Sequence, residues 1–213
     1  MTHRQPTVLS REDLPLAELL AARLDGEVFA IGRGFAPVDE FDLPSLRAAS
    51  LSSGLNGRLI AEQHTAAWIW GARVAPPSPH EFCAALDARV AHSLSSWLTV
   101  REVMIDAADV VVVGGVQVTT PLRTAIDLAR FSSHFDADRR VVAALMHLGD
   151  FGLPECVAQL DRRRNLPNKR MAAERLSGVH AIDVIHGIDA PHGVQNAIEM
   201  SRVAHLEDVS THG

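Results

Sequence analysis

The segment GGVQVTTPLRTAIDLAR, Gly114–Arg130, comes closest in residue types to a reactive or phosphate-binding site. Two glycines precede a short apolar stretch, paired threonines and a proline come after it, and Arg123 and Asp127 stand four residues apart. A P-loop needs GxxxxGK[ST], and no lysine follows these glycines. A bare helix N-terminus can still hold an anion weakly. We therefore interpret the segment as a structural joint between a hairpin and a helix.

The chain contains a single lysine, which bears on metal-dependent nuclease chemistry. Such chemistry uses carboxylates that hold a divalent metal and a lysine that polarises the attacking water. Lys169 is the one lysine among 20 cationic residues, and no D/E-x-K pattern surrounds it. We predict that the protein is not an enzyme, with no catalytic residues and no cofactor. An inactive relic of an endonuclease-like protein stays as an alternative.

Histidines recur near the C-terminal end of the chain. A spacing of six places the first three on one face if the segment is a strand. In zinc sites the ligands are usually closer in sequence, and carboxylates hydrogen-bond to the ligating histidines. We therefore predict no metal site and keep metal binding as an alternative. The histidines concerned are His180, His186, His192, His205 and His212.

The first 75 residues are predicted to form an N-terminal unit. Helical spacing of apolar residues predicts a helix over Leu14–Gly26, with the glycine at its end. Residues 27–37 then alternate around Gly32-Arg33-Gly34, which predicts a two-stranded wing. Further helices are expected within 43–54 and 57–71. Residues 1–75 are therefore interpreted as one unit, in which a helix leads into a small β-wing.

The adjoining region, residues 76–178, is predicted to be a small antiparallel sheet followed by helices. Strand-favouring runs begin at Glu81, and the last two form a hairpin that turns at Gly114-Gly115. Thr119 or Thr120 can cap the helix that Pro121 opens. The helical stretches expected are Pro121–Phe131, Asp136–Leu148, Pro154–Arg163 and Lys169–Leu176. The fold class is therefore α+β.

Arg123 and Asp127 can pair along one side of the predicted helix. We expect this pair to lie exposed on the flank, where it would contribute about 0.2–0.5 kcal/mol. The buried face of the same helix is expected to be apolar. Cys83 and Cys156 lie far apart in no metal-binding spacing, which favours packing roles for both.

Bulk composition restricts the class of protein further. The chain has 213 residues, 47% of them hydrophobic, enough for a core. A net charge of −6 argues against binding nucleic acid by blanket neutralisation of phosphates. No apolar run is long enough for a membrane span, and the N-terminus lacks a signal-peptide core. We expect a cytoplasmic protein that does not engage a membrane.

Three segments together resemble a known family. GGVQVTTPLRTAIDLARF, the glycine-rich wing IGRGFAPVD and the helix AEQHTAAWIWGARV are similar to AbiEi-type antitoxins and their actinobacterial transcriptional-regulator relatives. The likeness covers residues 12–150. It implies an N-terminal winged-helix-like unit that binds DNA, often the promoter of its own toxin–antitoxin operon. It also implies a mixed α/β part concerned with antitoxic action, and a cognate toxin as a partner.

The resemblance places Arg33 at the wing tip, where a contact to DNA is expected. Arg11 and Arg23 are expected only as phosphate partners. Residues 1–75 carry seven arginines against nine carboxylates, so no clear basic cluster supports the footprint. One firm helix precedes the wing, where helix-turn-helix readers present two, so the recognition helix is not identified.

The densest positive cluster lies elsewhere, in DRRRNLPNKR, residues 161–170. Such a run is usually a solvated helix end, but it is also the best electrostatic patch for a nucleic acid or an acidic partner protein. A protein-interaction module without DNA binding is therefore the second hypothesis. The residues of this patch are Arg162, Arg163, Arg164, Lys169 and Arg170.

The last segment, residues 179–213, changes character and does not resemble the corresponding region of the relatives. We expect either a disordered tail or the product of a frame shift.

Overall fold

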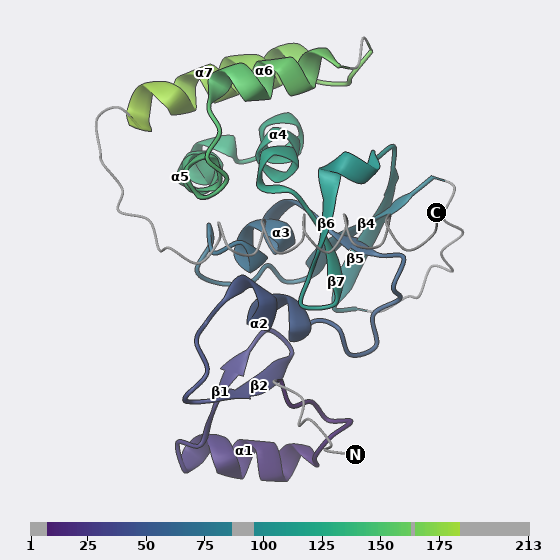
Figure 1. Ribbon diagram of the computed structural model, residues 1–213, viewed down its shortest axis with the longest axis vertical. Coiled ribbons are helices and arrows are strands. Elements are labelled where there is room, and N and C mark those ends of the chain that lie inside the picture. Colours follow the sequence, from purple (N-terminus) through teal and green to yellow (C-terminus); the bar gives the residue numbers. More distant parts are fainter. Residues whose placement is uncertain (1–7, 87–95, 163–164, 184–213) are drawn as a thin grey trace, which may run out of the picture.

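Two β-sheets and seven α-helices organise the chain in the computed structural model, which describes residues 8–86, 96–162 and 165–183 (Figure 1). The α+β class predicted from the sequence is confirmed. The elements are α1 Leu16–Leu24, β1 Val28–Ile31, β2 Gly34–Pro37, α2 Pro44–Ala49, β3 Ile60–Ala61, α3 Gln63–Ile69, β4 His80–Ala85, β5 Leu98–Val103, the 3-10 turn η1 Ala107–Asp109, β6 Val110–Val113, β7 Val116–Thr119, α4 Pro121–Phe131, α5 Phe135–Leu148, α6 Leu153–Asp161 and α7 Lys169–Asp183.

The N-terminal helix and ribbon form as the sequence predicts. β1 and β2 pair antiparallel, and Gly32 turns between them with φ of 52°, a conformation that favours glycine. A Cβ on Gly32 would collide with the Ser50 side chain and lie 3.0 Å from the Trp68 ring. The ribbon tip therefore packs closely against the α2–α3 region, while α1 lies at the far end of the molecule (Figure 1).

The larger sheet has the strand order β5-β4-β3-β7-β6. The prediction of an antiparallel sheet is wrong in part, because β3 pairs parallel with β7 and β4 pairs parallel with β5. The hairpin of β6 and β7 is confirmed, with Gly114 and Gly115 at φ of 54° and 80° in its two-residue turn. β3, too short to be recognised in the sequence, lies between β4 and β7, antiparallel to the first and parallel to the second.

The stretch 57–71, predicted as one helix, divides into β3 and α3. Two residues of strand, Ile60 and Ala61, pair with both β4 and β7 before the chain turns into the helix. β3 is thus a strand of the five-stranded sheet and α3 packs against that sheet, although the sequence division at residue 75 assigns both to the N-terminal unit. Helix α2 is also short, six residues, and is covered on one side by the hairpin turn.

Helix α3 packs against the sheet, α4 packs against α3, and α5, α6 and α7 pack against α4 (Figure 1). The core between them includes Trp70, which is fully buried and donates from its indole Nε1 to the carbonyl oxygen of Thr119 at 2.8 Å. Cys83 and Cys156 are free and fully buried, which confirms that both pack in the core.

Within the described part of the chain no single helix is both long and apolar enough to cross a membrane, although α5 and α6 would reach that length together across a 96° bend. Most of the tail, residues 179–213, lies outside the described residues. Its predicted disorder or frame shift, and its histidine row, therefore stay predictions.

Candidate functional site

The opening motif of the sequence forms the start of α4. The Thr120 hydroxyl accepts a hydrogen bond from the backbone N–H of Arg123 at 3.2 Å, and Pro121 occupies the first turn. The hydroxyls of Thr119 and Thr124 lie 2.7 Å apart and are buried. The predicted joint between hairpin and helix is confirmed, with the second threonine as the cap.

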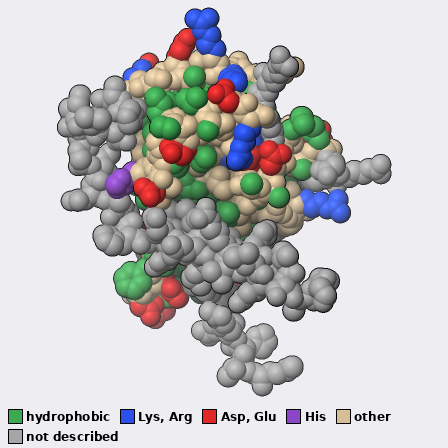
Figure 2. Space-filling view, turned by 45° about the horizontal axis from the view of Figure 1, so that its top comes forward, with side chains coloured by type: hydrophobic (Ala, Val, Ile, Leu, Met, Phe, Trp, Pro, Cys, Tyr) green, Lys and Arg blue, Asp and Glu red, His purple; other side chains and the backbone are tan. Residues whose placement is uncertain are grey.

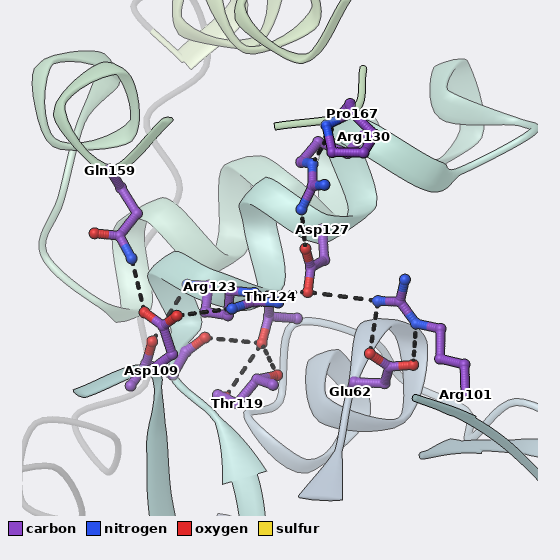
Figure 3. A network of polar contacts seen from close by, with 11 residues as sticks. Glu62, Arg101, Asp109, Thr119, Arg123, Thr124, Asp127, Arg130, Gln159 and Pro167 are labelled. Carbon is purple, nitrogen blue, oxygen red and sulfur yellow. Dashed lines mark hydrogen bonds and ion pairs between the residues drawn. The ribbon is translucent and has the colours of Figure 1, made fainter. Parts of the chain in front are cut away.

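Arg123 and Asp127 pair as their spacing predicts, but the expectation of an exposed flank is wrong. Arg123 is 6% exposed and Asp127 is fully buried, with Nε 2.8 Å from the Asp127 carboxylate. The other side of the guanidinium donates to Asp109 at 2.7 Å, and Asp109 also accepts from the Gln159 amide of α6 at 2.7 Å. The pair is buried because η1 and α6 close over the helix (Figure 3).

Asp127 is the centre of a wider network (Figure 3). Arg130 donates to its other carboxylate oxygen at 3.1 Å, and Arg101 of β5 lies 3.5 Å away. Arg101 also forms a bidentate pair with Glu62, the residue before α3, at 2.5 and 2.6 Å. Three guanidiniums thus meet three carboxylates, and the network joins α3, β5, η1 and α4.

Burial and pairing shift the pKa values of this network in opposite directions. Burial raises the pKa of Glu62, and the pair with Arg101 offsets this only in part. For Arg123 burial alone would lower the pKa, but the charges and hydrogen bonds of Asp127 and Asp109 outweigh it and raise the pKa. Burial and the neighbouring guanidiniums lower the pKa of Arg130. The three arginines and the three carboxylates of the network balance in charge, as buried ion pairs that stabilise a fold have to do.

The arrangement of this network favours a structural role over chemistry. Every carboxylate is occupied by arginine, so none is open to a metal or to a water for activation. The sequence does carry one signal for it: Asp127 stands between apolar residues on a largely apolar helix, which is typical of a buried charge. Glu62, Arg101 and Asp109 could not be connected with it because they come from distant elements.

His64 is held between two carboxylates beside this network. Its Nδ1 lies 3.0 Å from Glu81 of β4, and its Nε2 lies 3.0 Å from Asp138 of α5. The hydrogen bonds to Asp138 and Glu81 raise the pKa of His64 to about 9, against the opposing effect of burial. Burial would raise the pKa of Asp138, but His64 and the Ser132 hydroxyl, 2.6 Å away, lower it. A protonated His64 on α3 therefore forms ion pairs with both β4 and α5 and holds these elements together.

We expect the stabilising contribution of His64 to depend on pH. The folded state raises its pKa, so the contribution is complete below about pH 6.5 and disappears as pH rises through about 9. Since 19% of the imidazole is exposed, we expect about 1–2 kcal/mol. Urea unfolding of the wild type and of His64→Gln at pH 6 and pH 9.5 measures this contribution. We expect the difference in unfolding free energy between the two proteins to be about 1–2 kcal/mol smaller at pH 9.5 than at pH 6. An unchanged difference would contradict a stabilising charge on His64.

Arg33 lies at the ribbon tip, as the resemblance implies, but it is engaged within the protein. Its guanidinium carbon is 3.9 Å from the ring centroid of Trp97, just before β5. His80 lies behind Trp97 with ring centroids 5.9 Å apart. Burial and the Arg33 charge lower the pKa of His80 to about 4, and its buried Nδ1 has no partner among the described residues. Arg33 at the tip of the wing thus stacks on Trp97, and the Arg33 residue stays exposed to solvent.

Arg11 and Arg23 lie on the exposed surface, the first before α1 and the second in its last turn. In the described part of the chain neither forms an ion pair. Arg23 is near the open end of the ribbon, and Arg33 is at the closed end. Leu9, two residues before Arg11, pairs antiparallel with Phe35, two residues after Arg33. The structure therefore separates Arg23 from Arg33, while the segment that leads to Arg11 runs beside the ribbon.

The basic run 161–170 is partly neutralised by carboxylates. Lys169 pairs with Asp161 at 2.7 Å, and Arg170 pairs with Glu174 at 3.0 Å. Arg162 directly follows α6, and Arg163 and Arg164 lie outside the described residues. On the face drawn in Figure 2, cationic side chains lie apart, several beside acidic ones, and apolar side chains occupy much of the surface.

A hollow of about 470 Å³ lies between the start of α5 and α7. Two of its lining cations already have partners: Arg175 donates to the carbonyls of Ala129 and Ser132, and Arg139 donates to Asp136 at 2.9 Å. Over the described ranges, no group of three or more His, Cys, Asp or Glu side chains is arranged to hold a metal.

A family model described as the AbiEi antitoxin C-terminal domain matches residues 59–176. The match begins one residue before β3 and ends within α7, so it includes the whole five-stranded sheet and the buried charge network. No curated protein matches. Among solved structures, the crystal structure of the RV2827C protein from Mycobacterium tuberculosis is similar at 17% identity, covering 83% of this chain and 72% of that chain with a TM-score of 0.44.

Proposed function

The chain belongs to the AbiEi antitoxin C-terminal domain family, and from this we propose that it is a non-enzymatic, DNA-binding regulator of a toxin–antitoxin system in the cytoplasm. The family match supports a role related to toxin–antitoxin systems. The residues before the match would bind DNA upstream of the protein's own gene. The matched domain would hold these DNA-binding residues in place.

The observation that carries the proposal is the exposure of Arg11 and Arg23, although Arg47 of the same part is paired with Asp42 and Arg140 of the matched domain is also exposed. Arg101, Arg123 and Arg130 of the matched domain are taken up by buried carboxylates. Arg11 and Arg23, before the match, are exposed and form no ion pair in the described part of the chain. Cations without protein partners are the ones able to replace counterions at DNA phosphates.

The wing tip supports a limited contact of the same kind. Arg33 is exposed although it stacks on Trp97, so a phosphate can approach its free edge without loss of the stack. Because seven arginines face nine carboxylates in residues 1–75, we propose a few local contacts and not a continuous basic surface.

The test is a titration of labelled upstream DNA with single variants. We expect Arg11→Ala, Arg23→Ala and Arg33→Ala each to weaken binding several-fold and to lower its salt dependence by about one phosphate contact. Arg170→Ala is the matched control, because its guanidinium is paired with Glu174 and should change affinity little. If only the control variant weakens binding, the DNA surface is the basic run and not the N-terminal unit.

A second candidate function is the binding of a partner protein, the cognate toxin. Leu16, Leu20 and Leu24 recur every four residues on α1 and are 37%, 42% and 88% exposed, which is unusual for a DNA-contacting helix. Nuclease treatment distinguishes the candidates: a complex with the product of the neighbouring gene that survives nuclease, without any binding of upstream DNA, favours the partner protein.

A further inference from the structure

The edge strand β6 of the larger sheet is made only of valines. Its residues, Val110–Val113, carry no charge, and Val112 is 55% exposed. β7 lies on one side of β6, and the sheet order places no strand on the other. An edge without charged or proline residues is one that a further strand can join.

The hairpin geometry defines which backbone groups of this edge are free. A two-residue turn makes Val113 and Val116 a hydrogen-bonded pair, and such pairs alternate along an antiparallel ladder, so Val111 and Val118 form the next one. The N–H and C=O groups of Val110 and Val112 therefore point away from β7. The Val110 N–H already donates to the Ala107 carbonyl of η1, which leaves the Val110 C=O and both groups of Val112 open. Within the described ranges no backbone hydrogen bond from another element reaches these three groups.

The opposite edge of the sheet differs in character. β5, Leu98–Val103, carries Arg101 and Glu102 within the strand, and charged side chains are the usual protection of an edge against pairing. The turn end of β6 is covered by α2, because a Cβ on Gly114 would collide with the Ser45 carbonyl. What stays open on β6 is the uncharged segment centred on Val111.

We propose that β6 is a dimerisation edge that pairs antiparallel with β6 of a second copy of this chain. With a two-fold axis at Val111, Val110 of one copy faces Val112 of the other. The free N–H of each Val112 can then donate to the free C=O of Val110 in the other copy. No charge is buried between the two strands. The valine side chains of positions 110 and 112 also meet on one face of the joined sheet.

A second copy fits this edge better than an unrelated peptide does. The symmetric register matches the free donor of each strand, the Val112 N–H, with one of the two free acceptors of the other, the Val110 C=O, and leaves the Val112 C=O without a donor from the paired strand. A peptide would have to supply an equally uncharged segment. The inference does not depend on DNA binding, because its measurement is the mass of the protein alone. It adds an isologous interface, in which the same surface serves both partners.

The test measures the mass of the full chain by sedimentation over a range of concentrations. Val112→Pro removes the donor that each copy offers, leaves the ladder with β7 intact and is compatible with an edge strand. Val112→Lys places a cation of each copy on the same face of the joined edge. We expect the wild type to dimerise, and both variants to shift the dimerisation constant at least tenfold toward the monomer.

Val74→Lys is the matched control, because Val74 is 94% exposed and lies in a loop outside the sheet. It should dimerise as the wild type does. A thermal melt identifies a variant that fails to fold, and Val112→Lys decides the question if the proline variant does. A wild type that is monomeric at several hundred micromolar, or a dimer that a folded Val112 variant leaves unchanged, would overturn the proposal.

Discussion

Asp127→Asn is expected to lower the free energy of unfolding by about 3–5 kcal/mol, the usual loss when one member of a buried ion network is removed. Asp127 is fully buried and receives hydrogen bonds from Arg123 and Arg130. Asparagine would keep the shape of the side chain but leave three guanidiniums with two carboxylates. Urea unfolding at neutral pH measures the difference.

The control for this prediction is Asp136→Asn. Asp136 also pairs with an arginine three residues away, but its side chain is 92% exposed, so we expect a change within about 0.5 kcal/mol. If Asp127→Asn is as mild as its control, the network is not what holds α4 to its neighbours.

Gly114→Ala is expected to destabilise the protein by about 2–4 kcal/mol, from backbone strain and from overpacking. Its φ is 54°, and an added Cβ would collide with the Ser45 carbonyl and lie 3.0 Å from the Ala49 nitrogen of α2. The hairpin turn and α2 would have to move apart. Thermal or urea unfolding of the variant measures the cost.

Gly115→Ala is the matched control in the same turn. Gly115 has a φ of 80°, but nothing lies within 4 Å of its added Cβ. It should therefore show only the cost of the left-handed backbone, about 1 kcal/mol. Equal losses for the two variants would mean that α2 does not pack on the turn.

The helices and the hairpin were predictable because their signals are local. Pro121 after paired threonines marks the start of α4, and Gly114-Gly115 between apolar runs marks the β6–β7 turn. β3 was not recognised because it is two residues long and continues directly into α3. The parallel pairing of β3 with β7 depends on that strand, and the parallel pairing of β4 with β5 joins strands whose relative direction no local signal gives.

The candidate site was predictable only in its local pair. The spacing of Arg123 and Asp127 identifies their contact, but their burial depends on Asp109 and Arg101, which approach from other elements. The same limit applies to Arg33: the ribbon places it at a tip, but only the tertiary fold brings Trp97 beneath it. Local sequence thus predicts pairs, and the assembled sheet determines their surroundings.

The proposed binding of DNA upstream of the protein's own gene is measured most directly by the affinity of the protein for that DNA at several salt concentrations. We expect binding tighter than to unrelated DNA of equal length, with the logarithm of the association constant falling linearly with the logarithm of salt concentration, by about 0.9 for each phosphate contacted. No binding to any upstream fragment at low salt, or equal binding to the unrelated DNA, would contradict the account.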